Sequence, residues 1–235
     1  MDHSEARYGL TTFSPSGELV QIKYAQAAVN KGATSLGIVA TGGVVIAAEK
    51  KAPSPLIDTS TVQKVFELDE HCGCVYSGLG PDSRLLVDEA RKECQSYRKT
   101  YQESIPILQL TRFVAAVYQE YTQSGGVRPF GVALLICGVD STGYHLYQLD
   151  PSGTYLPWKA VAIGRNASNA KSTLEKRYLP EAEIEDAVNT ALITLKDGMD
   201  GKMTPMNTEV GCVRGKRFEI LTSEQLVDYL EQVLW

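Results

Sequence analysis

The sequence predicts an α+β fold, a four-layer αββα sandwich in which two mainly antiparallel sheets lie between layers of helices. The first observation is the order of the predicted elements: strands, two helices, strands, two helices, strands and a final helix. Strict strand–helix alternation is absent, which disfavours a doubly wound parallel sheet. The second observation is composition, since 235 residues with 43% hydrophobic side chains can bury a sizeable core. No linker divides the chain, so we expect one domain over residues 1–235.

The first half of the chain begins with a helix. A turn at 14–17 precedes residues 18–30, where Ile22, Ala25 and Val29 share one helical face. A Gly-Gly pair between the next two apolar runs is a hairpin signal. The other predicted elements are strands at 34–40, 44–49, 62–68 and 74–77, and helices at 81–101 and after Pro106.

The second half repeats strands followed by two helices. Residues 183–199 form the clearest amphipathic helix, with Val188 and Leu192 on its apolar stripe. Thr222 and Gln225 form a capping box that starts the last helix. The predicted strands are 131–139, 144–149, 160–164, 208–213 and 217–221, and the predicted helices are 167–179, 183–199 and one that ends near 234.

Charge and cysteine usage disfavour several classes of protein. The net charge is −5, whereas nucleic-acid-binding proteins usually have a basic face. No apolar run reaches ten residues, so we expect no membrane partner, and the polar N-terminus lacks the features of a signal peptide. The five cysteines are predicted to be reduced core residues of a cytosolic protein. Cys72-Gly-Cys74 lacks a second ligand pair for a metal, and no cofactor is expected.

Motifs of known enzymes are few. No serine stands in a G-x-S-x-G context, and the S-x-x-K matches at 96–99 and 168–171 lack their partner motifs. The three histidines are not spaced as metal ligands. Asn166 begins a formal glycosylation sequon, but we expect it to be a helix N-cap.

One group of residues suggests an anion-binding site. Lys64 lies on a predicted strand, and Gly78-Leu79-Gly80 leads into the helix predicted at 81–101. Backbone N–H groups at a helix start together with a Lys ammonium can bind an anion or a C-terminal carboxylate. Glycine allows a ligand backbone to approach closely. The alternative is a solvent-facing lysine beside an ordinary turn.

Two segments resemble a known family. Residues 8–29 read YGLTTFSPSGELVQIKYAQAAV, and residues 123–131 read QSGGVRPFG. With the runs at 150–153 and 174–178, they resemble the α-type subunits of the 20S proteasome over essentially the whole chain. The resemblance implies an N-terminal-nucleophile hydrolase-like sandwich in a ring with six other α-type subunits. It also implies contacts with β-ring subunits and activator particles, a role in ubiquitin-dependent and related protein degradation, and a location in cytoplasm and nucleus.

The resemblance also assigns roles to residues near the N-terminus. Residues 1–11 would form a gate tail, and Tyr8, Pro15 and Tyr24 would be gate and turn residues. The chain departs from the family at residues 6–8, which read Ala-Arg-Tyr where many members have Tyr-Asp-Arg.

A second set of implied roles concerns an activator pocket. By resemblance, Lys64, Gly78 and Leu79 help to bind the C-terminal carboxylate of an activator subunit. Lys23 replaces a Glu that many members have beside this pocket. If Lys23 points into the pocket it adds positive charge, and if it points outward it is an ordinary surface lysine.

The nucleophile of active relatives is missing. The active β-type relatives use an N-terminal Thr, and alignment on the hairpin places Ala33 at that position, with Glu49 and Lys64 in the regions of the helper residues. We therefore expect a non-catalytic subunit. One alternative is an N-terminal-nucleophile peptidase that matures at Thr34, and another is a free-standing peptide-binding module.

Overall fold

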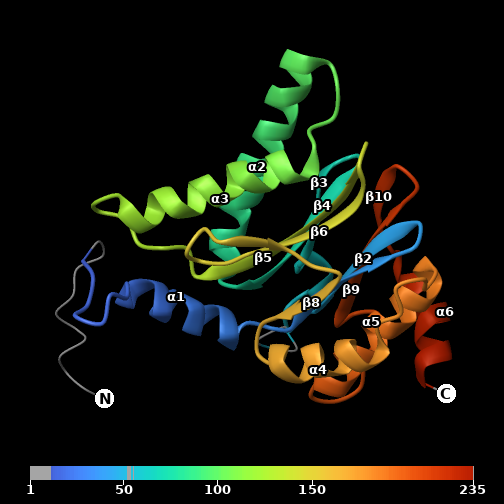
Figure 1. Cartoon of the computed structure of the whole chain (residues 1–235). Helices are drawn as coiled ribbons and strands as arrows, with labels where there is room; N and C mark the ends of the chain where they lie inside the picture. Colours follow the sequence, from blue (N-terminus) through green and yellow to red (C-terminus); the bar gives the residue numbers. More distant parts are fainter. Residues whose placement is uncertain (1–11, 52–53, 55, 235) are drawn as a thin grey trace.

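The computed structural model describes residues 12–51, 54 and 56–234. Within them, two five-stranded sheets pack face to face with helices on both outer faces (Figure 1). The strand orders are β10-β9-β2-β1-β8 and β3-β4-β5-β6-β7, and all neighbouring strands are antiparallel. The predicted four-layer αββα sandwich is therefore confirmed.

The bounds of the elements follow the predicted order. The strands are β1 Ser35–Ala40, β2 Gly43–Glu49, β3 Val65–Asp69, β4 Cys72–Gly78, β5 Val132–Asp140, β6 Gly143–Leu149, β7 Tyr155–Pro157, β8 Ala160–Ile163, β9 Thr208–Arg214 and β10 Arg217–Ile220. The helices are α1 Val20–Lys31, α2 Gly80–Tyr101, α3 Ile107–Gln123, α4 Ala167–Arg177, α5 Ile184–Gly198 and α6 Ser223–Leu234, with a 3-10 turn at Thr59–Thr61.

Strand periodicity divides the apolar side chains among three cores. On β2, Val45 packs toward α4, α5 and α6, whereas Val44 and Ile46 face the opposite sheet. This is the two-residue alternation of a strand. A third core lies between the second sheet and the pair α2 and α3. Three stacked cores account for the four layers.

Helix α1 lies at one end of the sandwich and packs against β4 and β5. Its buried Val29 joins the core between the sheets. The helix ends at Gly32, where an added Cβ would lie 2.3 Å from the backbone nitrogen of Gly78. The C-terminal end of α1 is therefore fixed directly against the end of β4.

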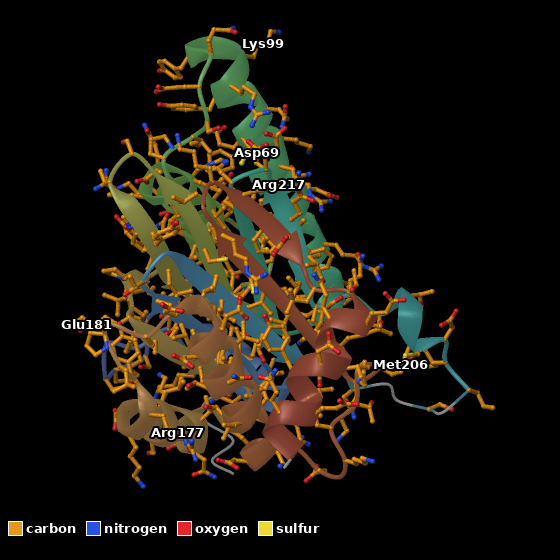
Figure 2. The ribbon with its side chains drawn as sticks, turned by 90° about the vertical axis from the view of Figure 1, so that its right-hand side faces the viewer. Asp69, Lys99, Arg177, Glu181, Met206 and Arg217 are labelled. Carbon is orange, nitrogen blue, oxygen red and sulfur yellow. The ribbon has the colours of Figure 1, made fainter. Side chains whose placement is uncertain are left out.

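An ion pair joins the second sheet to the long helix α2. Figure 2 shows Asp69, the last residue of β3, beside this helix. Arg98 donates through Nη2 to both carboxylate oxygens of Asp69, at 2.8 Å each. Lys99, one residue further, lies near one end of the molecule in the same view.

The local structure differs from the predicted elements at one strand and agrees with them at two helix starts. The three-residue strand β7 was not predicted. The prediction that Asn166 is a helix N-cap is confirmed for α4, although its side chain donates to the carbonyl of Gly198 and not to the helix. The predicted capping box is confirmed, since Gln225 accepts the N–H of Thr222 at 2.9 Å and Thr222 accepts that of Gln225 at 3.3 Å.

Several predicted features concern absences or the N-terminus. Among the described helices, none combines the length and apolar character that a membrane span requires. The five cysteines are free and buried. The gate tail at residues 1–11, which includes Tyr8, lies outside the described residues.

Candidate functional site

A cavity of about 430 Å³ opens where the end of α1, the start of β3 and the end of β4 meet. It collects residues that are far apart in the sequence and mixes cationic with small side chains. The lining residues are Lys31, Ala33, Lys51, Val62, Lys64, Tyr76, Gly78 and Arg165. Lys64 and Gly78 of the predicted anion site therefore line one cavity.

Lys64 lies directly before β3 and is only 6% exposed. The prediction that it lies within a strand is wrong by one residue, and so is the alternative of a solvent-facing lysine. Glu209 of β9 explains this position, because its Oε2 accepts the N–H groups of Lys64 at 2.6 Å and Val65 at 3.0 Å. The carboxylate thus anchors the backbone at the start of β3.

The ammonium of Lys64 is held over an aromatic ring. Its Nζ lies 4.1 Å from the centroid of Tyr76, a cation–π distance. Burial lowers the pKa of Lys64 to about 8, while the carboxylates of Glu49 and Glu209 act in the opposite direction. Desolvation therefore outweighs the nearby negative charges. The cavity contains a cation that would gain from a negative ligand.

Gly78 forms a wall of the cavity that no other residue could form. Its φ is +118°, and an added Cβ would lie 2.2 Å from the carbonyl oxygen of Gly131. Leu79 follows as the N-cap of α2, and its N–H donates to the same oxygen at 3.0 Å. This N–H is therefore already paired and is not one of the helix-start groups that could bind an anion. The Leu79 side chain is 44% exposed and is not part of the lining.

Sequence reasoning missed the ion pair that supports this wall. Asp82 accepts hydrogen bonds from two nitrogens of Arg128, at 2.7 and 2.8 Å, and from the N–H of Gly131 at 2.9 Å. Burial alone would raise the pKa of Asp82, but the bonds from Arg128 and Gly131 hold this pKa below its ordinary value. The available signal was the Arg-Pro-Phe-Gly run at 128–131, which we used only for its resemblance.

The predicted turn and gate residues lie on or before α1. Pro15 stands in a turn closed by the N–H of Gly17, which donates to the carbonyl of Ser14 at 2.8 Å. Tyr24 is 48% exposed on α1. Lys23 pairs with Glu18, five residues earlier, and is not part of the cavity lining. The structure of the chain therefore separates Lys23 from Lys64 and Gly78.

The residues that the resemblance assigns to the nucleophile and helper positions lie close to one another. Ala33 lines the cavity with Lys64, and Glu49 lies close enough to affect the Lys64 pKa. The hydroxyl of Thr34 is buried and has no hydrogen-bond partner among the described residues. No group of three or more His, Cys, Asp or Glu within the described part of the chain is arranged to bind a metal.

Comparison with known proteins gives one consistent family. A family model described as Proteasome subunit matches residues 29–213. A Trypanosoma brucei brucei protein named proteasome subunit alpha type-2 is 64% identical over 230 residues, covering 98% of this chain and 100% of the relative. Proteins of the same name from Oryza sativa subsp. japonica and Drosophila melanogaster are each 55% identical, covering 99% and 96% of this chain. They cover 100% and 97% of those relatives.

Proposed function

The chain belongs to the proteasome subunit family, among its α-type members, and on that premise we propose how it acts in the assembled particle. Its α-type character makes it a non-catalytic subunit that assembles with other proteasome subunits. The expectation of a peptidase maturing at Thr34 is thereby set aside. The finer proposal is a place in a seven-membered α ring with six other α-type subunits, stacked on a β ring, in cytoplasm and nucleus.

The cavity around Lys64 would dock the C-terminal carboxylate of an activator subunit. The observation that carries this proposal is the buried ammonium of Lys64, which lines the same cavity as Gly78. A carboxylate can supply the negative charge that this ammonium lacks. In a ring, the neighbouring subunit would complete the groove. Leu79, which is exposed at the N-cap of α2, would then contact the docked peptide rather than bind its carboxylate.

The N-terminal tail would form part of a gate over the axial pore. Residues 1–11, with Tyr8, would cross the pore, and the turn at Pro15 would set the direction of the chain before α1. Two observations support this proposal. The turn at 14–17 is closed by a hydrogen bond, and the ring of Tyr24 is exposed on α1, where a neighbouring subunit could contact it. Lys23 would act at the ring interface through its pair with Glu18.

The docking proposal is tested with synthetic peptides and the assembled particle. A peptide that ends in a free carboxylate should bind, and the same peptide ending in an amide should bind at least tenfold more weakly, because only the first carries a charge for Lys64. Lys64→Met should remove this difference at one pocket of the ring. Lys51→Met, a change of the same kind in the same cavity, is the matched control. Equal binding of both peptides to wild-type particles would overturn the proposal.

A further inference from the structure

The amine of Lys64 is buried without a neutralising partner. Within the described residues, its Nζ forms no ion pair or hydrogen bond, and its one close polar contact is the face of Tyr76 at 4.1 Å. Glu209, one of the two acids that act on this amine, accepts the backbone N–H groups of Lys64 and Val65. The side chain is thus fixed in place while its nitrogen remains unpaired.

The charged groups around the cavity belong to several elements. Cations come from the end of α1 at Lys31, from the segment after β2 at Lys51 and from the segment after β8 at Arg165. Acids come from β2 at Glu49 and from β9 at Glu209.

The backbone holds Glu209, whereas Arg165 holds Glu49 only in part, since Oε2 of Glu49 is buried without a hydrogen-bond partner among the described residues. Arg165 lies 3.5 Å from Glu49 and 3.4 Å from Asp200, and Lys51 lies 3.9 Å from Asp200. Burial among these groups lowers the pKa of Lys64 to about 8, with Glu49 and Glu209 opposing the change. A neutral amine is therefore abundant near physiological pH.

We propose that Lys64 is a modification site, where the neutral amine reacts with small acyl thioesters that enter the cavity and becomes an amide. The inference stands on burial, the missing partner and the open cavity, and it does not depend on activator docking. Ala33, whose side chain is a single methyl group, lines the same cavity of about 430 Å³ as Lys64, which is space enough for an acetyl group. The ring of Tyr76, 4.1 Å from Nζ, helps to hold the Lys64 side chain in place.

The reaction is a simple acyl transfer. The lone pair of Nζ attacks the thioester carbonyl, a C–N bond forms, the C–S bond breaks, and the thiolate leaves with the bonding electrons. The extra proton on nitrogen passes to water, and nothing is oxidised or reduced. The amide is neutral at every physiological pH. If the proposed docking is right, acylation would therefore remove the charge that binds an activator carboxylate.

The pKa of Lys64 determines how much faster it should be acylated than an ordinary lysine. At about pH 7.5, roughly a quarter of the Lys64 amine is neutral, against about one part in a thousand for an ordinary lysine with a pKa near 10.5. A less basic amine is also a weaker nucleophile, which reduces this advantage. We expect an acylation rate at least about tenfold above that of a free lysine amine.

The experiment treats the purified, assembled particle with S-acetyl-N-acetylcysteamine and measures acetylation of each lysine by peptide mass spectrometry. Nα-acetyl-lysine amide in the same tube is the reference amine, and Lys51 is a second lysine in the same cavity. The rate at Lys64 should exceed the reference at about pH 7.5 and level off above about pH 8.5, while the reference still rises about tenfold per pH unit. The signal should be absent in Lys64→Arg.

Two outcomes would overturn the inference. One is a Lys64 rate at or below that of the reference amine, and the other is a rate that rises without levelling off. Labelling is measured without any activator, so it does not depend on docking. If Lys64 shows the expected profile but acetylated particles bind carboxylate peptides unchanged, the docking proposal fails and the modification site stands.

Discussion

The carboxylate of Asp82 and the guanidinium of Arg128 form a two-point ion pair across 46 residues of sequence, with N···O distances of 2.7 and 2.8 Å. The same carboxylate holds the N–H of Gly131, whose carbonyl meets Gly78 and Leu79. A helix, a loop and a strand end are thereby linked behind one wall of the Lys64 cavity.

The two members of this pair should differ in their effect on stability. Arg128 is largely exposed while Asp82 is buried, so solvent screens the pair from the side of the arginine and we expect Arg128→Ala to cost about 1 kcal/mol. Asp82→Ala also leaves the Gly131 N–H without its acceptor, so we expect a loss of about 1–3 kcal/mol in the free energy of unfolding, against a smaller loss for Arg128→Ala. Denaturant unfolding measures both. Asp88→Ala, exposed on the same helix, is the control, and equal losses at residues 82 and 128 would contradict this account.

Lys64 should destabilise the fold in a pH-dependent way. Its pKa is about 8 when folded, against about 10.5 for an ordinary lysine, so the unfolded chain binds more protons between these values. Stability from this group therefore rises as pH increases from about 8 to about 10.5 and is lowest below about 8. We expect Lys64→Met to raise the free energy of unfolding by up to about 3 kcal/mol at pH 7. The gain should vanish by about pH 10.5, and a constant difference across pH would contradict the lowered pKa.

The exposed face of α1 is expected to contact a neighbouring subunit. Ala27 is exposed in the chain, whereas Ala28 lies against Gly131, since a Cβ on that glycine would be 3.5 Å from it. Ala27→Arg should therefore leave the melting temperature of the chain unchanged but exclude it from full-size particles. Native mass spectrometry of the particles measures the exclusion. Ser172→Arg, an exposed change on α4, is the matched control, and normal incorporation of Ala27→Arg would show that no close contact exists there.

If residues 1–11 act as the proposed gate, deletion of residues 2–9 should open it. We expect faster hydrolysis of small peptides by the assembled particle, with unchanged labelling of the β-subunit active sites by a covalent inhibitor. Residues 6–8 depart from the family pattern, so the size of the change in hydrolysis rate has to be measured for this tail and cannot be carried over from other members. An unchanged hydrolysis rate would mean that the tail does not limit passage.

Local patterns were enough to predict the elements and layers of the fold. Period-two alternation on β2 and the Gly-Gly hairpin signal refer to neighbouring residues, and the sandwich follows from their order. Strand β7 was missed because three residues are too few to show a period. The side chain of Asn166 escaped prediction because its partner, Gly198, is 32 residues away.

Only part of the site was predictable from the sequence, since Lys64 and Gly78 line the cavity but Leu79 and Lys23 do not. Lys64 and Gly78 could be named from their residue types and positions. The burial of Lys64 could not, because it depends on Glu209, which is 145 residues away and pins the backbone. The Asp82–Arg128 pair has the same character. Long-range polar contacts leave no periodic trace in a sequence.

The strands at the borders of the two sheets are all short. β8 and β10 have four residues each, β7 has three, and β3 has five with an irregular register between Glu67 and Asp69. An unpaired strand border is a template for aggregation, and brevity is one of the ways in which proteins suppress it. A newly synthesised copy waiting for its partners thus presents little backbone for improper strand addition. Recognition between subunits must then depend on helices and loops, whose side chains can distinguish one neighbour from another.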